Sequence, residues 1–114
     1  MSFSENELKY IDLVVGEFCK SLTKPDIADQ LNYSYEVDEH SVIVYENRLN
    51  WTGSGSQTQI EIAKFEYNKP KNVWLLYWMK GDLKWHRFEP AEETDSLEQL
   101  IEAVRKDEHC AFFG

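Results

Sequence analysis

The chain has 114 residues and a formal net charge of −9, and this length suits one domain with a core of its own. It contains no run of about 18 apolar residues, which excludes a transmembrane helix. The first residues also lack the basic and apolar regions of a signal peptide, so we expect a cytoplasmic protein. The acidic balance favours solubility and disfavours binding to nucleic acid or to an anionic membrane.

The first part of the chain, residues 4–31, is predicted to be helical. Ser4 and Glu7 have the spacing of a capping box, in which each side chain binds the backbone N–H of the other residue. Apolar residues then recur at steps of three and four, which predicts a helix with one face on a sheet. They are Leu8, Ile11, Val15, Phe18 and Leu22. The segment 23–26, Thr-Lys-Pro-Asp, is typical of a helix start, so a short second helix is expected to end near Leu31.

The two cysteines, Cys19 and Cys110, lie far apart in the sequence. In a reducing compartment both are expected to be free thiols. Cys19 lies beside the apolar stripe of the first helix, where a small buried thiol is expected. Gly16 interrupts the same helix and indicates a close approach to a neighbouring element.

Residues 32–89 are predicted to form a five-stranded antiparallel sheet in which each strand pairs with the next. Apolar runs, alternating side chains and turn residues indicate strands at 32–37, 42–46, 58–67, 73–79 and 83–88. In the third strand the apolar residues change sides between Ile62 and Ala63. A β-bulge at this point would return them to one face. The expected fold is a single α+β domain over residues 1–114.

A tryptophan-rich hairpin, residues 73–88, is the expected folding centre of the domain. Residues 73–79 are all apolar or aromatic, which predicts a strand that is covered on both faces. Side chains of the next strand alternate, with Trp85 and Arg87 on one side and His86 on the other. Burial of one indole removes about 150–250 Å² from water, so this hairpin is the best material for a core.

A C-terminal helix is predicted over residues 95–107, because Asp95 and Glu98 have capping-box spacing. Its apolar stripe is predicted to be buried. The stripe consists of Leu97, Leu100, Ile101 and Val104. The final segment, residues 109–114, contains two phenylalanines, and we expect it to dock on the sheet as a short apolar tail.

Four segments carry a resemblance to a known family. They are Ala63-Lys64-Phe65-Glu66-Tyr67, Trp74-Leu75-Leu76-Tyr77-Trp78, Lys84-Trp85-His86-Arg87-Phe88 and Cys110-Ala111-Phe112-Phe113-Gly114. The chain resembles a family of short bacterial proteins described as domain of unknown function 3024, and the resemblance covers most of its length. It implies a bacterial protein of one domain, and it implies no activity.

Patterns for catalysis and metal binding are sparse. His86 is a candidate acid or base, but no acidic residue is placed beside it by spacing. The three histidines and two cysteines have none of the spacings of metal sites. The glycine-serine segment 53–56 lacks the lysine and the following helix of a phosphate-binding loop. No cofactor and no metal are expected, and a small enzyme with a cleft around His86 stays an alternative.

Aromatic and basic residues are interleaved in the second half of the sheet. Residues 58–88 contain six basic and three acidic residues, and the rest of the chain is strongly acidic. Such a surface is typical of binding to a protein, a small aromatic ligand or single-stranded nucleic acid, and the overall charge disfavours the last of these. The expected function is a non-catalytic binding or adaptor module, with a homodimer through exposed aromatic residues as another alternative. The candidate binding residues are Trp51, Lys80, Lys84, Trp85, His86 and Arg87.

Overall fold

The computed structural model describes residues 3–49, 57–80, 82–89, 93–107 and 112. Three consecutive segments form the N-terminal helix: α1 (Glu5–Ile11), η1 (Asp12–Gly16) and α2 (Glu17–Leu22). A short turn, η2 (Pro25–Ile27), leads into the strands β1 (Leu31–Asp38), β2 (Ser41–Leu49), β3 (Gln57–Asn68), β4 (Val73–Met79) and β5 (Trp85–Arg87). The last helix is α3 (Leu97–Lys106). None of the helices in these ranges is long and apolar enough to cross a membrane.

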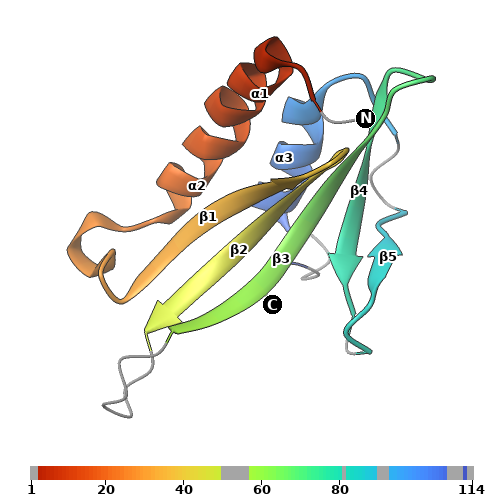
Figure 1. Ribbon diagram of the computed structural model, residues 1–114. Helices are drawn as coiled ribbons and strands as arrows, with labels where there is room; N and C mark the ends of the chain where they lie inside the picture. Colours follow the sequence, from red (N-terminus) through yellow and green to blue (C-terminus); the bar gives the residue numbers. More distant parts are fainter. Residues whose placement is uncertain (1–2, 50–56, 81, 90–92, 108–111, 113–114) are drawn as a thin grey trace.

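The strands form one antiparallel sheet in the order β1-β2-β3-β4-β5, so each strand pairs with its neighbour in sequence (Figure 1). This confirms the predicted meander and the α+β class. The predicted bulge is also confirmed, because Val44 pairs with Ala63 and Tyr45 pairs with Glu61, which leaves Ile62 as an extra residue. Because of the extra residue, the apolar side chains of both halves of β3 lie on the same side of the sheet.

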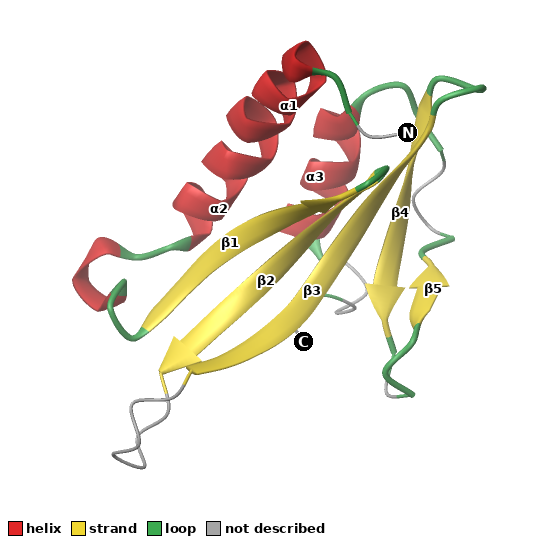
Figure 2. Ribbon diagram, viewed as in Figure 1, coloured by secondary structure: helices red, strands yellow, loops and turns green. Residues whose placement is uncertain are grey.

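The helices α1, α2 and α3 lie on one side of the sheet, and no described helix covers the other side (Figure 2). Several sheet residues on the covered side are completely buried. They include Val42, Val44, Ala63, Phe65 and Leu76. The helices contribute a second set of buried side chains, which packs against the first. This set includes Ile11, Val15, Phe18, Leu97, Leu100 and Val104. The core of the described residues is therefore a single layer between helices and sheet. We call the opposite face of the sheet, which no described helix covers, the open face.

The N-terminal helix begins as predicted and then departs from regular α-helical geometry. Ser4 Oγ accepts a hydrogen bond from the Glu7 N–H at 3.2 Å, and Glu7 Oε1 accepts one from the Ser4 N–H at 2.8 Å, which confirms the capping box. The segment η1 is a π-helical turn, a rare feature that occurs often at functional sites. The predicted second helix is wrong in length: it is a single 3-10 turn, because Leu31 is already paired in β1.

The C-terminal helix also starts later than predicted. Ser96, not Asp95, is the N-cap residue of α3, and no side chain caps the helix. The cause lies in the preceding backbone, because the Trp74 N–H donates to the Thr94 carbonyl and the Ser96 N–H donates to Thr94 Oγ1. These bonds keep the chain extended up to Ser96, so the helix begins at Leu97. The predicted apolar stripe of this helix is confirmed, because all four of its residues are buried.

Phe112 is the one described residue of the predicted tail, and it is buried. Its ring centroid lies 5.0 Å from that of Phe88, and its N–H donates to Asp107 Oδ1 at 3.0 Å. This residue therefore docks on the hairpin. Residues 108–111 and 113–114 lie outside the described residues.

The prediction that β4 is covered on both faces is wrong. Trp74 and Leu76 are buried under the helices, and the Trp74 ring stacks on Phe3 with centroids 5.7 Å apart. The alternate residues are only half-buried. These are Val73, Leu75, Tyr77 and Met79. The continuous apolar run arises because the open face of this strand is itself apolar, not because a second layer covers it.

Replacement of Phe65 by alanine tests the position of the core. Phe65 is completely buried between neighbouring strands and the helices, so we expect Phe65→Ala to lower the free energy of unfolding by about 3–5 kcal/mol. Ile60→Ala, at a side chain that is 38% exposed, is the control and should cost about 1 kcal/mol. Urea denaturation measures both values, and equal costs would contradict this description of the core.

Candidate functional site

The predicted binding residues of the hairpin do not form one surface. Trp85 pairs with Met79 and Arg87 pairs with Tyr77, which places both on the open face of the sheet. His86 pairs with Trp78, whose strand neighbour Leu76 is buried under the helices, so His86 lies on the opposite side.

The two lysines of the hairpin and Trp51 complete the predicted set. Lys80 also lies toward the side of His86, because its Nζ is 5.2 Å from the ring centroid of Trp78. Lys84 is exposed in the turn, and its N–H donates to Asp82 Oδ1 at 3.0 Å. Trp51 lies outside the described residues.

On the open face, cationic and aromatic side chains lie in register across neighbouring strands. Lys64 of β3 pairs with Tyr77 of β4, which pairs with Arg87 of β5. The Lys64 Nζ lies 5.7 Å from the centroid of the Tyr77 ring, a distance at which a cation is attracted to an aromatic face. Met79 and Trp85 form the adjacent row. We call Lys64, Tyr77, Met79, Trp85 and Arg87 the open-face patch.

The aromatic members of the open-face patch are half-buried, and Arg87 is exposed. Burial raises the pKa of Tyr77 and hydrogen bonding to Glu66 raises it further, whereas the positive charge of Arg87 acts in the opposite direction. The phenol therefore stays neutral at physiological pH and is able to donate a hydrogen bond. The patch presents apolar surface with a cation on two sides, and the carboxylate of Glu66 is bonded to the Tyr77 phenol.

His86 has an acidic partner that the sequence analysis missed. Its Nε2 lies 2.9 Å from Asp82 Oδ2, and this hydrogen bond, together with the one from the Lys84 N–H, lowers the pKa of Asp82. An aspartate that binds a backbone N–H two residues later is a common turn motif, and this pattern in residues 82–84 was the available signal. The side chains of His86 and Asp82 are 35% and 48% exposed. The pair therefore links the turn before β5 to the strand itself, in a setting that water reaches.

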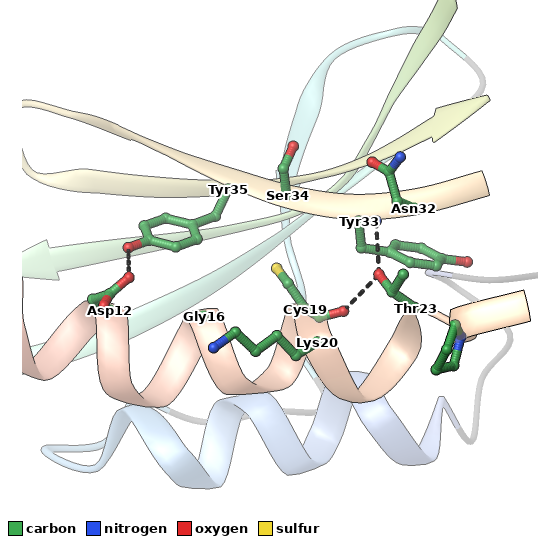
Figure 3. A pocket seen from close by; sticks show the side chains of 10 residues that line it. Asp12, Gly16, Cys19, Lys20, Thr23, Asn32, Tyr33, Ser34 and Tyr35 are labelled. Carbon is green, nitrogen blue, oxygen red and sulfur yellow. Dashed lines mark hydrogen bonds between the residues drawn. The ribbon is translucent and has the colours of Figure 1, made fainter. Parts of the chain in front are cut away.

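A second candidate site, which the sequence analysis did not identify, is a concave surface between the N-terminal helix and β1 (Figure 3). It has a volume of about 490 Å³, and we call it the β1 groove. Residues that line it include Asp12, Gly16, Cys19, Thr23, Tyr33 and Tyr35. Two hydrogen bonds join the helix side to the strand. Tyr35 donates its hydroxyl proton to Asp12 Oδ1 at 2.6 Å, and the Tyr33 N–H donates to Thr23 Oγ1 at 3.1 Å.

Cys19 points from the helix toward β1, between Tyr33 and Tyr35 (Figure 3). It is a buried free thiol, as predicted, and burial raises its pKa to about 11. Burial, followed by the hydrogen bond to Asp12, also raises the pKa of Tyr35 to about 12. Both groups are neutral at physiological pH, so Cys19 is not an activated nucleophile. Within the described part of the chain, no group of three or more histidine, cysteine or acidic side chains is placed to hold a metal ion.

Comparison with known proteins gives a family match over nearly the whole chain. The family described as "Domain of unknown function (DUF3024)" matches residues 3–114. The chain belongs to this family. Searches of curated proteins and of solved structures returned no match. The DUF3024 description carries no activity, so any function of this member has to be argued from its own surfaces.

Removal of the histidine ring tests the Asp82–His86 pair. His86 is the largest cause of the low Asp82 pKa, so His86→Ala should move this pKa back toward its ordinary value of 3.8. The measurement is an NMR titration of the Asp82 carboxyl carbon. Lys80→Ala is the control and should have a smaller effect, because Lys80 acts on Asp82 only by charge and is the weakest cause. An unchanged pKa in His86→Ala would show that the pair is absent in solution.

The reactivity of Cys19 follows from its raised pKa. In a Cys110→Ser background, Cys19 is the one thiol of the chain. A pKa of about 11 in place of 9.0 lowers the thiolate fraction near neutral pH about 100-fold. Alkylation of the folded protein by iodoacetamide should therefore be at least about 100-fold slower than alkylation of the urea-unfolded chain. The raised pKa also means that stability falls as the pH rises from 9 toward 11, because the unfolded thiol loses its proton first. Equal alkylation rates would contradict the burial of Cys19.

Proposed function

We propose that this DUF3024 protein is a non-catalytic binding module whose open-face patch contacts an acidic and partly apolar segment of a partner protein. The observation that carries the proposal is the row of Lys64, Tyr77 and Arg87, in register across three strands on the face that no described helix covers. This row places two positive charges beside aromatic surface that water only partly reaches.

The composition of the patch supports a protein partner. Tyrosine, tryptophan, methionine and arginine are enriched at protein interfaces, and tryptophan, tyrosine and arginine account for most binding hot spots. The patch combines all four residue types. Its lysine and arginine are complementary to an acidic segment, whereas the overall net charge of −9 opposes a nucleic acid.

The described structure also favours binding over catalysis. The thiol of Cys19 is held in its unreactive, protonated form, and the pair of His86 and Asp82 is open to water. A small enzyme with a cleft around His86 is therefore the weaker proposal. A free thiol at Cys19 fits a reducing compartment, which supports a cytoplasmic location.

Selection from a random peptide library tests the proposed surface. Dodecapeptides displayed on phage and selected on the intact protein should combine aspartate or glutamate with aromatic or aliphatic residues. Arg87→Ala should lower the affinity for a selected peptide by about tenfold, since loss of a hot-spot side chain costs roughly 1–2 kcal/mol of binding free energy. Lys71→Ala is the matched control, because it removes the same charge from an exposed position in the β3–β4 turn. The affinity of this variant for the peptide should stay within about twofold of that of the unmodified protein. Fluorescence anisotropy gives both affinities.

Two results would refute the proposed surface. One is an unchanged affinity in Arg87→Ala. The other is a doubling of the mass of the free protein at high concentration, measured by light scattering and abolished by Trp85→Ala. The second result would mean that the patch joins two copies of this chain.

A further inference from the structure

β1 is an edge strand, and part of its backbone points away from the sheet. In the part of the chain that the structure describes, it pairs with β2 on one side and with no strand on the other. The Tyr33 N–H donates to Thr23 Oγ1 instead of to β2. Because successive N–H groups of a strand point in opposite directions, the N–H groups of Tyr35 and Val37 also point away from β2. Among the described residues, neither of these two N–H groups has a hydrogen-bond acceptor.

The β1 groove lies along this edge. Asp12, Gly16 and Cys19 form its helix side, and β1 forms the other side (Figure 3). A Cβ atom on Gly16 would lie 3.2 Å from Asp12 Oδ1, which is a tight contact, and 3.7 Å from a carbon of the Tyr35 ring, so glycine leaves room for the Asp12 carboxylate that binds Tyr35. The π-helical turn, which includes both Asp12 and Gly16, is often found at ligand sites.

Two hydrogen bonds between the helix and the strand fix the width of the groove. Tyr35 is held to Asp12, and the Tyr33 N–H is held to Thr23. Between these two bridges, the thiol of Cys19 provides an uncharged floor. A small apolar side chain of a ligand suits this floor, whereas a charged one would lose its hydration there.

The charge of the strand indicates which ligand fits. Beyond the groove, β1 ends in the exposed residues Glu36, Val37 and Asp38, and Glu39 follows in the turn. A basic segment would be attracted to these acids. A second copy of the chain would bring the same acids and a further charge of −9, which opposes pairing of one β1 with another.

We propose that the edge of β1 binds an extended, basic segment of a partner protein as an added strand. The backbone of the segment pairs with the N–H groups of Tyr35 and Val37, as in other cases of recognition by strand addition. A small apolar side chain enters the β1 groove, and lysine or arginine side chains meet Glu36 and Asp38. With the open-face patch, this gives the module two separate binding surfaces of opposite charge preference.

A synthetic peptide serves as the probe. A capped heptapeptide of alternating lysine and valine is titrated into the ¹⁵N-labelled full chain, and a glutamate-valine heptapeptide is the charge control. Only the basic peptide should shift the amide signals of Tyr35 and Val37. It should also slow hydrogen exchange of these two amides about tenfold, because they gain acceptors.

Val37→Pro tests the backbone contact directly. Proline at this position removes an N–H that points away from β2, so the β1–β2 ladder keeps its hydrogen bonds. The variant should bind the basic peptide about tenfold more weakly, because it lacks one backbone bond and its ring obstructs the added strand. Val37→Ala keeps the N–H and is the matched control, with an affinity within about threefold of the unmodified chain.

Charge reversal keeps the proposal testable if Val37→Pro fails to fold. The double variant Glu36→Lys with Asp38→Lys should prefer the acidic heptapeptide. The proposal is overturned if both peptides bind the unmodified chain equally, if the exchange of the Tyr35 and Val37 amides is unchanged, or if Val37→Pro folds and binds normally. It is also overturned if the basic peptide shifts only signals of the open-face patch. None of these results depends on Arg87, so this proposal and the proposed function fail separately.

Discussion

The fold depends on one extra residue in β3. Ile62 has no partner in β2, and this register shift lets Ala63 and Phe65 share a face with Ile60. With a regular strand the two halves of β3 would present apolar side chains on opposite faces. The helices could then cover only one of them. The bulge places the apolar residues of β3 under one layer of helices, and the alternate side chains of this strand, including Lys64, therefore lie on the open face.

A sheet covered on one side has an open face and two edges, and in this protein the three have different side chains and neighbours. The open face carries Lys64, Tyr77 and Arg87 in register. At the β5 edge, the pair of Asp82 and His86 links the preceding turn to the strand. The β1 edge lies beside the N-terminal helix, but the helix is held at a distance that leaves a groove. Edges and open faces are where unsatisfied backbone groups and apolar surface remain available for partners.

The candidate groups for chemistry lie in two kinds of environment. Cys19 is buried and neutral and Tyr35 is half-buried and neutral, whereas the side chains of His86 and Asp82 are partly exposed to water. Neither environment prepares a group to transfer protons or attack a substrate. These environments agree with the proposed binding function, in which neutral hydrogen-bonding groups and fixed charges act without chemical activation.

Local patterns in the sequence were sufficient for most of the fold. The capping box of Ser4 and Glu7, the bulge at Ile62 and the antiparallel order of the strands depend on neighbours in sequence, and each was predicted correctly. The cap at Asp95 was wrong because Thr94 pairs with the distant Trp74, which no local pattern shows. The two-sided burial of β4 was wrong because an apolar run does not reveal whether a second layer exists.

The sequence by itself determined which residues alternate along the hairpin, and therefore that Trp85 and Arg87 oppose His86. Only the tertiary structure decided which of these sides the helices share, and that Lys64 joins Arg87 around Tyr77. It alone brought Asp12 to Tyr35 and Thr23 to Tyr33, across separations that are set by how the helix docks on β1. The reason is physical: alternation is a local property of an extended backbone, whereas a groove exists only where two elements pack at a particular distance.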